Sequence, residues 1–221
     1  MLPRLRKFVL TTHITLSVGW IGAVCAYLVL VVMAMSGQDT QTLHAAWIAM
    51  GLIGWYILVP FALASLLTGL VMSLGTRWGL FRHYWVLTSF ALTLVATVVL
   101  LQHMRTVSAF AHMAAEADRA DVGRLRGALW GELLHAGVGL LVLLTIEMLN
   151  VYKPQGMTAY GRRRMPQGAV HYRSVEDVRS VPGRKVGTGI PRWARVVGIH
   201  AAGLALLLAI IHLASGGLQH H

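Results

Sequence analysis

The chain has 221 residues, of which 56% are hydrophobic and only 12% are charged, and its formal net charge is +11. A soluble domain carries about twice that charged fraction, so the composition excludes an ordinary soluble protein. The basic residues lie in segments beside apolar stretches, which favours contact with anionic lipid headgroups over binding of nucleic acid.

Five apolar stretches are long enough to cross a bilayer, which takes about 20 residues. The sequence therefore predicts an all-α integral membrane bundle with spans at 8–35, 47–74, 84–101, 129–149 and 196–214. The whole chain, 1–221, is expected to form one transmembrane helical domain. The segment 104–120 is rich in Ala and Met and lacks Gly and Pro, so it is expected to continue as a helix that packs across the mouth of the bundle.

Basic residues predict the orientation of the chain. Fifteen of them lie before the first span, between the second and third spans, and in the loop 153–195, whereas four lie in the other connections. Because positive loops stay on the cytoplasmic side, we expect the N-terminus in the cytoplasm and the C-terminus outside. The expected location is the plasma membrane, crossed several times.

Eleven histidines are present, and those inside spans are the candidate site residues. A histidine within a bilayer needs partners for two ring nitrogens and by default marks a site. The histidines expected near the inner face are His13, His83 and His200. Those expected near the outer face are His44, His103, His135 and His212.

Two histidines at equal depth on facing helices could supply both axial nitrogens of a haem iron. The inner pair would be His13 with His200 or with His83 as a substitute, and the outer pair would be His135 with His103 or His212. No single helix carries two of these on one face, so each pair comes from different helices. One or two b-type haems would fit. For the metal candidates His13, His135 and His200, the alternative is a structural hydrogen bond across a helix contact.

Other residues leave further alternatives open. Glu132 lies three residues before His135 and could orient its ring. Trp20 shares a helical stripe with His13, and this stripe faces either the bundle or the lipid. The methionines near the outer layer are Met33, Met35, Met50, Met104 and Met113. Thioether and imidazole ligands suit Cu(I), although methionine is also a good apolar filler.

The first span, THITLSVGWIGAVCAYLVL, places His13 seven residues before Trp20, with Gly22 following. It resembles the opening helix of the membrane superfamily that includes the copper-resistance D proteins and the J-type protoporphyrinogen oxidases. That resemblance implies a His-containing helical bundle, an association with haem b and a ligand role for His13. The segments SLLTGLVMSLGTRWGLFRHYWVL and VYKPQGMTAYGRR look closer to a family of bacterial inner-membrane proteins without an assigned function.

The leading interpretation is a b-type haem-binding membrane protein in electron transfer, with quinol as an expected donor or acceptor. The alternatives are copper transport or handling and a cofactor-free membrane subunit or scaffold. The sequence shows no nucleophilic triad, phosphate loop or cysteine metal motif, and whether the protein is an enzyme stays open. The expected partners are the lipid bilayer, a quinone or a redox protein, and a second copy in a homo-oligomer, but no nucleic acid.

Overall fold

The computed structural model describes residues 2–37, 39–75, 80–116, 121–153 and 156–163. Within these ranges the chain is all-helical, apart from one isolated antiparallel bridge between His83 and Met157. Four helices are long and apolar enough to cross a membrane, so this is a membrane protein whose helices contact the lipid bilayer. The fifth expected span, 196–214, lies outside the described residues.

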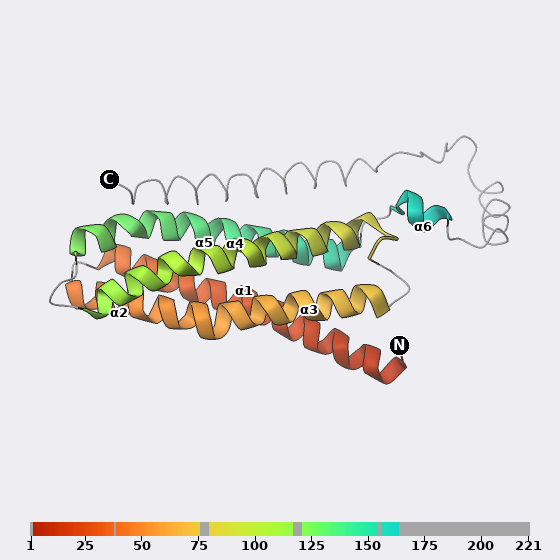
Figure 1. The fold of residues 1–221 in the computed structure, drawn as a ribbon, viewed down its shortest axis with the longest axis horizontal. Coiled ribbons are helices and arrows are strands. Elements are labelled where there is room, and N and C mark those ends of the chain that lie inside the picture. The colour runs from red at the N-terminus through yellow and green to blue at the C-terminus, as the bar shows by residue number, and fades with distance from the viewer. Residues whose placement is uncertain (1, 38, 76–79, 117–120, 154–155, 164–221) are drawn as a thin grey trace.

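The long helices form an antiparallel bundle (Figure 1). The elements are α1 (Pro3–Ser36), α2 (Thr40–Ile53), the π-helical turn η1 (Gly54–Leu58), α3 (Val59–Gly75), α4 (Tyr84–Ala115), α5 (Val122–Tyr152) and the short α6 (Ala159–Arg163). Because α2, η1 and α3 follow one another without a break, they act as one long helix. This long helix packs between α1 and α4, and α5 closes the ring by packing against both α1 and α4.

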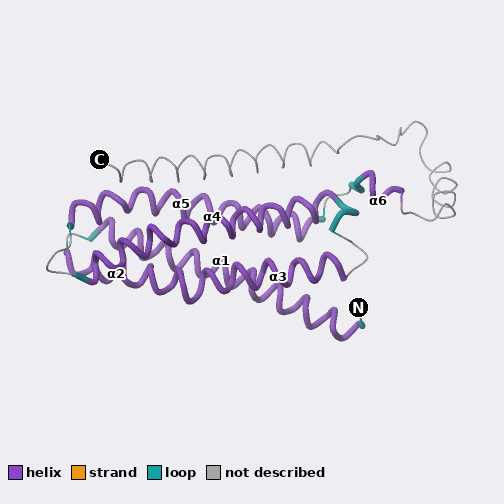
Figure 2. The backbone as a smooth tube through the Cα atoms, in the orientation of Figure 1, coloured by secondary structure: helices purple, strands orange, loops and turns teal. Residues whose placement is uncertain are grey.

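The connections alternate between the two ends of the bundle, as Figure 2 shows. The N-terminus, the α3–α4 connection and the C-terminal end of α5 share one end, here called the N-terminal end. The α1–α2 and α4–α5 connections share the opposite end. There, Asp39 caps α2 by accepting from the backbone amides of Gln41 and Thr42, and Asp121 caps α5 by accepting from that of Arg124.

The helical continuation expected beyond the third span is confirmed as far as Ala115. The expectation that it packs across the mouth of the bundle is wrong, because the far half of α4 runs along the bundle beside α2. Its buried face carries on through Met104, Val107 and Phe110 at helical spacing. The ring centroid of Phe110 lies 4.8 Å from that of Trp47 in α2. The far half of α4 is therefore the packing partner of α2.

The π-helical turn has a local cause in the sequence. Pro60 has no N–H, and its ring would clash with the carbonyl of Tyr56 in a regular α-helix. A wider turn relieves this clash, and the amide of Val59 bonds the carbonyl of Gly54, five residues earlier. Met104 occupies the space beside Gly54, so a Cβ there, 2.6 Å from the Met104 sulfur, would require the methionine side chain to shift. The turn thus lets α4 pack closely against the α2–α3 helix.

Candidate functional site

A group of polar side chains joins α1, α4 and α5 in the half of the bundle nearer the opposite end. The hydroxyl of Tyr27 donates to Glu132 Oε2 at 2.6 Å, and His103 Nε2 lies 3.0 Å from the same oxygen. The ring of His135 stacks on that of His103, with centroids 3.6 Å apart and planes inclined by 13°. These four residues, Tyr27, His103, Glu132 and His135, are called the Glu132 cluster below.

The cluster forms because polar residues occupy buried positions of otherwise apolar helix faces. Tyr27 follows Trp20 and Val24 on the buried face of α1, and Glu132 follows Leu129 on that of α5. Glu132 is only 2% exposed. A carboxylate in such surroundings is strongly destabilising unless it is hydrogen-bonded. The two donors on Oε2 meet that need and hold three helices together.

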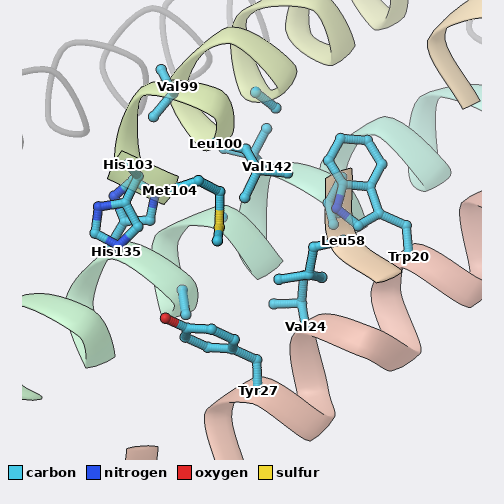
Figure 3. A pocket seen from close by; sticks show the side chains of 14 residues that line it. Trp20, Val24, Tyr27, Leu58, Val99, Leu100, His103, Met104, His135 and Val142 are labelled. Atoms are coloured by element: carbon cyan, nitrogen blue, oxygen red, sulfur yellow. The ribbon is translucent and has the colours of Figure 1, made fainter. Parts of the chain in front are cut away.

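A cavity of about 60 Å³ lies beside the cluster, between α1, η1, α4 and α5. Figure 3 shows the stacked imidazoles of His103 and His135 at one end and the side chains of Trp20 and Leu58 towards the other. Tyr27 points its hydroxyl towards the imidazoles. Apart from Tyr27 and the two imidazoles, the wall is made almost entirely of hydrocarbon and the Trp20 ring. The cavity therefore has one polar end and one apolar body.

The stacked pair does not fit a haem held between His103 and His135. Axial imidazoles lie on opposite faces of a porphyrin and point a nitrogen at the iron. Two parallel rings with centroids 3.6 Å apart leave no space for the macrocycle, and Nε2 of His103 is already bonded to Glu132. The alternative pairing of His135 with His212 lies outside the described residues.

A second polar region lies between α1 and α3, nearer the N-terminal end. His13 Nδ1 lies 2.9 Å from Thr68 Oγ1, and the Ser17 and Ser65 hydroxyls lie 2.9 Å apart one turn further along. These four residues are called the His13 seam below. A Cβ at position 69 would lie 3.2 Å from His13 Cε1, so Gly69 is what lets the imidazole lie close to α3.

The hydrogen bonds of Thr68 define the tautomer of His13. The Thr68 hydroxyl is 2.7 Å from the Ala64 carbonyl and 3.1 Å from that of Ser65, so its single hydrogen is donated within α3. Towards His13 it can only accept, which places the imidazole hydrogen on Nδ1. In the neutral ring the lone pair is then on Nε2. This is the arrangement in which a histidine ligates a metal through Nε2 while a partner fixes its orientation.

The other predicted site residues are dispersed. His200 and His212 lie outside the described residues, so the pairing of His200 with His13 stays a prediction. His83 lies in the α3–α4 connection, where its backbone forms the isolated antiparallel bridge with that of Met157. His44 lies in the first turns of α2, and its buried Nε2 has no hydrogen-bond partner. Within the described ranges, no group of three His, Cys, Asp or Glu residues is arranged to hold a metal ion.

Three methionines of the expected outer layer lie in different surroundings. Met104 lines the cavity with both cluster histidines, and Met50 is fully buried in the core. Met33 is 51% exposed on α1 and faces away from that core. Of these three thioethers, Met104 is the one that lies beside cluster imidazoles in the cavity wall, and the copper alternative stays a prediction.

Sequence reasoning missed Tyr27 and gave Glu132 a different partner. Glu132 was expected to orient His135, but the ring it bonds is His103, on which His135 stacks. A tyrosine in the middle of an apolar span needs a partner for its hydroxyl, and that signal could have identified Tyr27. Trp20 is only 4% exposed and lines the cavity, so its stripe faces the bundle rather than the lipid.

The resemblance of the first span to the haem and copper families rests on the residues around His13 and stays a prediction. Comparison with known proteins adds no family: no protein-family model, no curated protein and no solved structure matches this chain.

Proposed function

We propose that the protein binds a b-type haem in the membrane and transfers electrons, with quinol or a redox protein as its donor or acceptor. The observation that carries the proposal is the 2.9 Å contact between His13 Nδ1 and Thr68 Oγ1. Because the Thr68 hydroxyl donates to the Ala64 carbonyl, Nε2 of the neutral ring keeps the lone pair that would ligate iron. Bound haem iron supplies a one-electron redox centre. Within the described chain, Thr68 orients the ligand ring and Gly69 makes room for it.

The second ligand of this site would be His200, on a fifth span at the same depth. This assigns five spans to the chain, with the N-terminus in the cytoplasm, the C-terminus outside, and the plasma membrane as its location. The described helices support that arrangement because their connections alternate between two ends. The asymmetry of fifteen against four basic residues supports its direction.

The test of haem binding is an optical spectrum of the detergent-purified protein before and after dithionite. We expect a Soret band, with α and β bands in the reduced form. His13→Ala and His200→Ala should each remove this spectrum, because each deletes an axial nitrogen. A full haem content in both variants would rule out these ligands.

Thr68→Val gives a finer test, because it keeps the shape of the side chain and removes the acceptor for His13 Nδ1. We expect a shifted Soret band or weaker haem retention. Thr93→Val is the matched control, since the hydroxyl of Thr93 donates to the carbonyl of Ser89 in its own helix. The proposal predicts a wild-type spectrum for this control.

Two other functions give different results in the same preparation. Copper handling predicts a protein without a Soret band that retains copper in a fixed ratio. A cofactor-free subunit predicts neither, and the observation that favours it is that His13 and His103 both have hydrogen-bond partners. Haem and metal analysis of one sample therefore separates all three functions.

The proposed orientation is tested with single cysteines in a Cys25→Ser background. Gly123→Cys at the start of α5 should react with an impermeant thiol reagent in intact cells, because this connection would lie outside. Gly168→Cys in the loop 153–195 should react only after the cells are opened. The reverse pattern would overturn the orientation.

A further inference from the structure

We propose that the cavity beside the Glu132 cluster binds the ring of a lipid-soluble quinol or quinone. The inference rests on the proposed function, because such a molecule would be the electron donor or acceptor of the haem. It goes further in assigning a binding site, at the Glu132 cluster, that is separate from the His13 seam.

The polar end of the cavity suits the oxygen of such a ring. A quinol oxygen donates a hydrogen bond and a quinone oxygen accepts one, and an imidazole can do either according to its tautomer. His103 and His135 both line this end. Behind them, Glu132 bonds His103 and Tyr27, which fixes the ring that the ligand would meet. A carboxylate that is almost completely buried in a membrane span marks a functional site by default.

The rest of the cavity suits a flat apolar ring. Ala96, Ala136 and Gly139 contribute walls of small side chains, and Trp20 contributes an aromatic ring. Ligand pockets typically combine such apolar walls with a few polar groups that fix orientation. Since the helices around it face lipid, a ligand would enter from the bilayer, and it must therefore be soluble in lipid.

Size determines how the ring would enter. An apolar cavity that accepts benzene has a volume of about 150 Å³, whereas this one has about 60 Å³. Binding therefore requires a side chain to swing aside, and Met104 in the wall is unbranched and flexible. Next to Gly139 the space is open, because no atom lies within 4 Å of a Cβ built there.

Two glycines of α5 provide a matched pair of variants. Gly139→Leu places a side chain in the cavity, because Gly139 is part of its wall. Gly137→Leu makes the same change two residues away, where a Cβ also meets nothing within 4 Å but the residue is not part of the wall. Both replace a helical glycine with a better helix former, so any general effect on the helix should be shared.

The experiment measures saturable quenching of tryptophan fluorescence by decylubiquinone, a short-chain benzoquinone, in purified protein. Wild type and Gly137→Leu should bind the quinone with the same affinity. Gly139→Leu should bind it at least about tenfold more weakly, which corresponds to roughly 1.4 kcal/mol of binding free energy. Equal affinity in the two leucine variants would overturn the proposal. An absence of saturable binding in wild type would overturn it as well.

A third variant tests the polar end. His135→Phe keeps a ring stacked on His103 and removes the nitrogens, so affinity should fall about tenfold, as for one lost hydrogen bond. Unchanged affinity would show that the imidazole plays no part and would overturn the assigned orientation. Haem content is measured in the same samples. Quinone binding without haem would refute the proposed function and keep this site, whereas haem without quinone binding would do the opposite.

Discussion

The Glu132 cluster and the His13 seam are both polar regions inside one apolar bundle, but they are built differently. The cluster joins three helices around a buried carboxylate, that of Glu132, which is hydrogen-bonded to Tyr27 and His103. The seam joins two helices through hydroxyls and one neutral imidazole, and its residues are partly buried except Ser65, which is buried. The cluster therefore stabilises the bundle and holds its shape, whereas the seam orients one imidazole, which in the proposed function would bind iron through Nε2.

Removal of the carboxylate should have the largest effect on stability. Glu132→Ala leaves the Tyr27 hydroxyl and the His103 imidazole buried without their acceptor, so we expect the free energy of unfolding to fall by about 3–5 kcal/mol. Unfolding in mixed micelles of dodecyl maltoside and SDS measures this change. Glu147→Ala, on a partly exposed position of the same helix, is the control and should have a much smaller effect. Similar losses of unfolding free energy in both variants would contradict a special contribution of the cluster to stability.

Removal of one donor to the same carboxylate should have an intermediate effect. Tyr27→Phe keeps the ring and deletes a 2.6 Å hydrogen bond, so the expected loss is about 1.5–3 kcal/mol, as for bonds to charged groups. The same unfolding assay measures it. Tyr56→Phe deletes a hydroxyl from a side chain that is 77% exposed, and its stability should match that of wild type.

The hydrogen bonds of the His13 seam should contribute less to stability than those of the Glu132 cluster. A double-mutant cycle of Ser17→Ala and Ser65→Ala isolates the energy of the hydroxyl pair from other effects of each substitution. Hydrogen bonds between membrane helices contribute about 0.6 kcal/mol on average, and we expect a coupling of that size. A coupling energy as large as the loss in Tyr27→Phe would contradict the proposed difference between the two regions.

The smallest expected effect on stability is that of pH on the exposed N-terminal cap of α2. Hydrogen bonds from the Thr42 amide and hydroxyl and the Gln41 amide hold the pKa of Asp39 below its ordinary value. A lowered folded-state pKa stabilises the cap above the ordinary carboxyl pKa of about 3.9, and this contribution disappears as the pH falls through the folded-state value. Amide exchange in the first turn of α2 should therefore become less protected, relative to the intrinsic rate, below about pH 4. Asp39→Asn, which caps without titrating, should remove that dependence.

The long elements could be predicted from the sequence because apolar length alone determines a span. The first four expected spans begin and end within the observed helices α1, α2–α3, α4 and α5, and the expected helical continuation of the third is confirmed to Ala115. The packing partner of the far half of α4 could not be predicted in this way. This half contains Arg105 and His112, which lowers the hydropathy there, but its buried face keeps the helical period and packs on α2.

The site could be predicted only in part, since hydropathy and depth give the level of a residue in the membrane but not its partners. The sequence predicts His103 and His135 at one level, and in the structure their rings stack. Their stacking, however, depends on the rotation of α4 against α5. The bond from Tyr27 to Glu132 joins residues 105 positions apart, and a single sequence contains no direct sign of it.

The π-helical turn at Gly54–Leu58 accommodates one residue more than a regular turn would, and this keeps α3 in register with α1. Each residue of an α-helix rotates the helix by about 100°. If this stretch were a regular α-helix with every residue retained, α3 would turn by about that angle relative to α2, and Ser65 and Thr68 would face away from α1. Deleting Trp55 would instead let the helix run on regularly with Ser65 and Thr68 still facing α1. A relative that lacks one residue here would therefore keep the His13 seam.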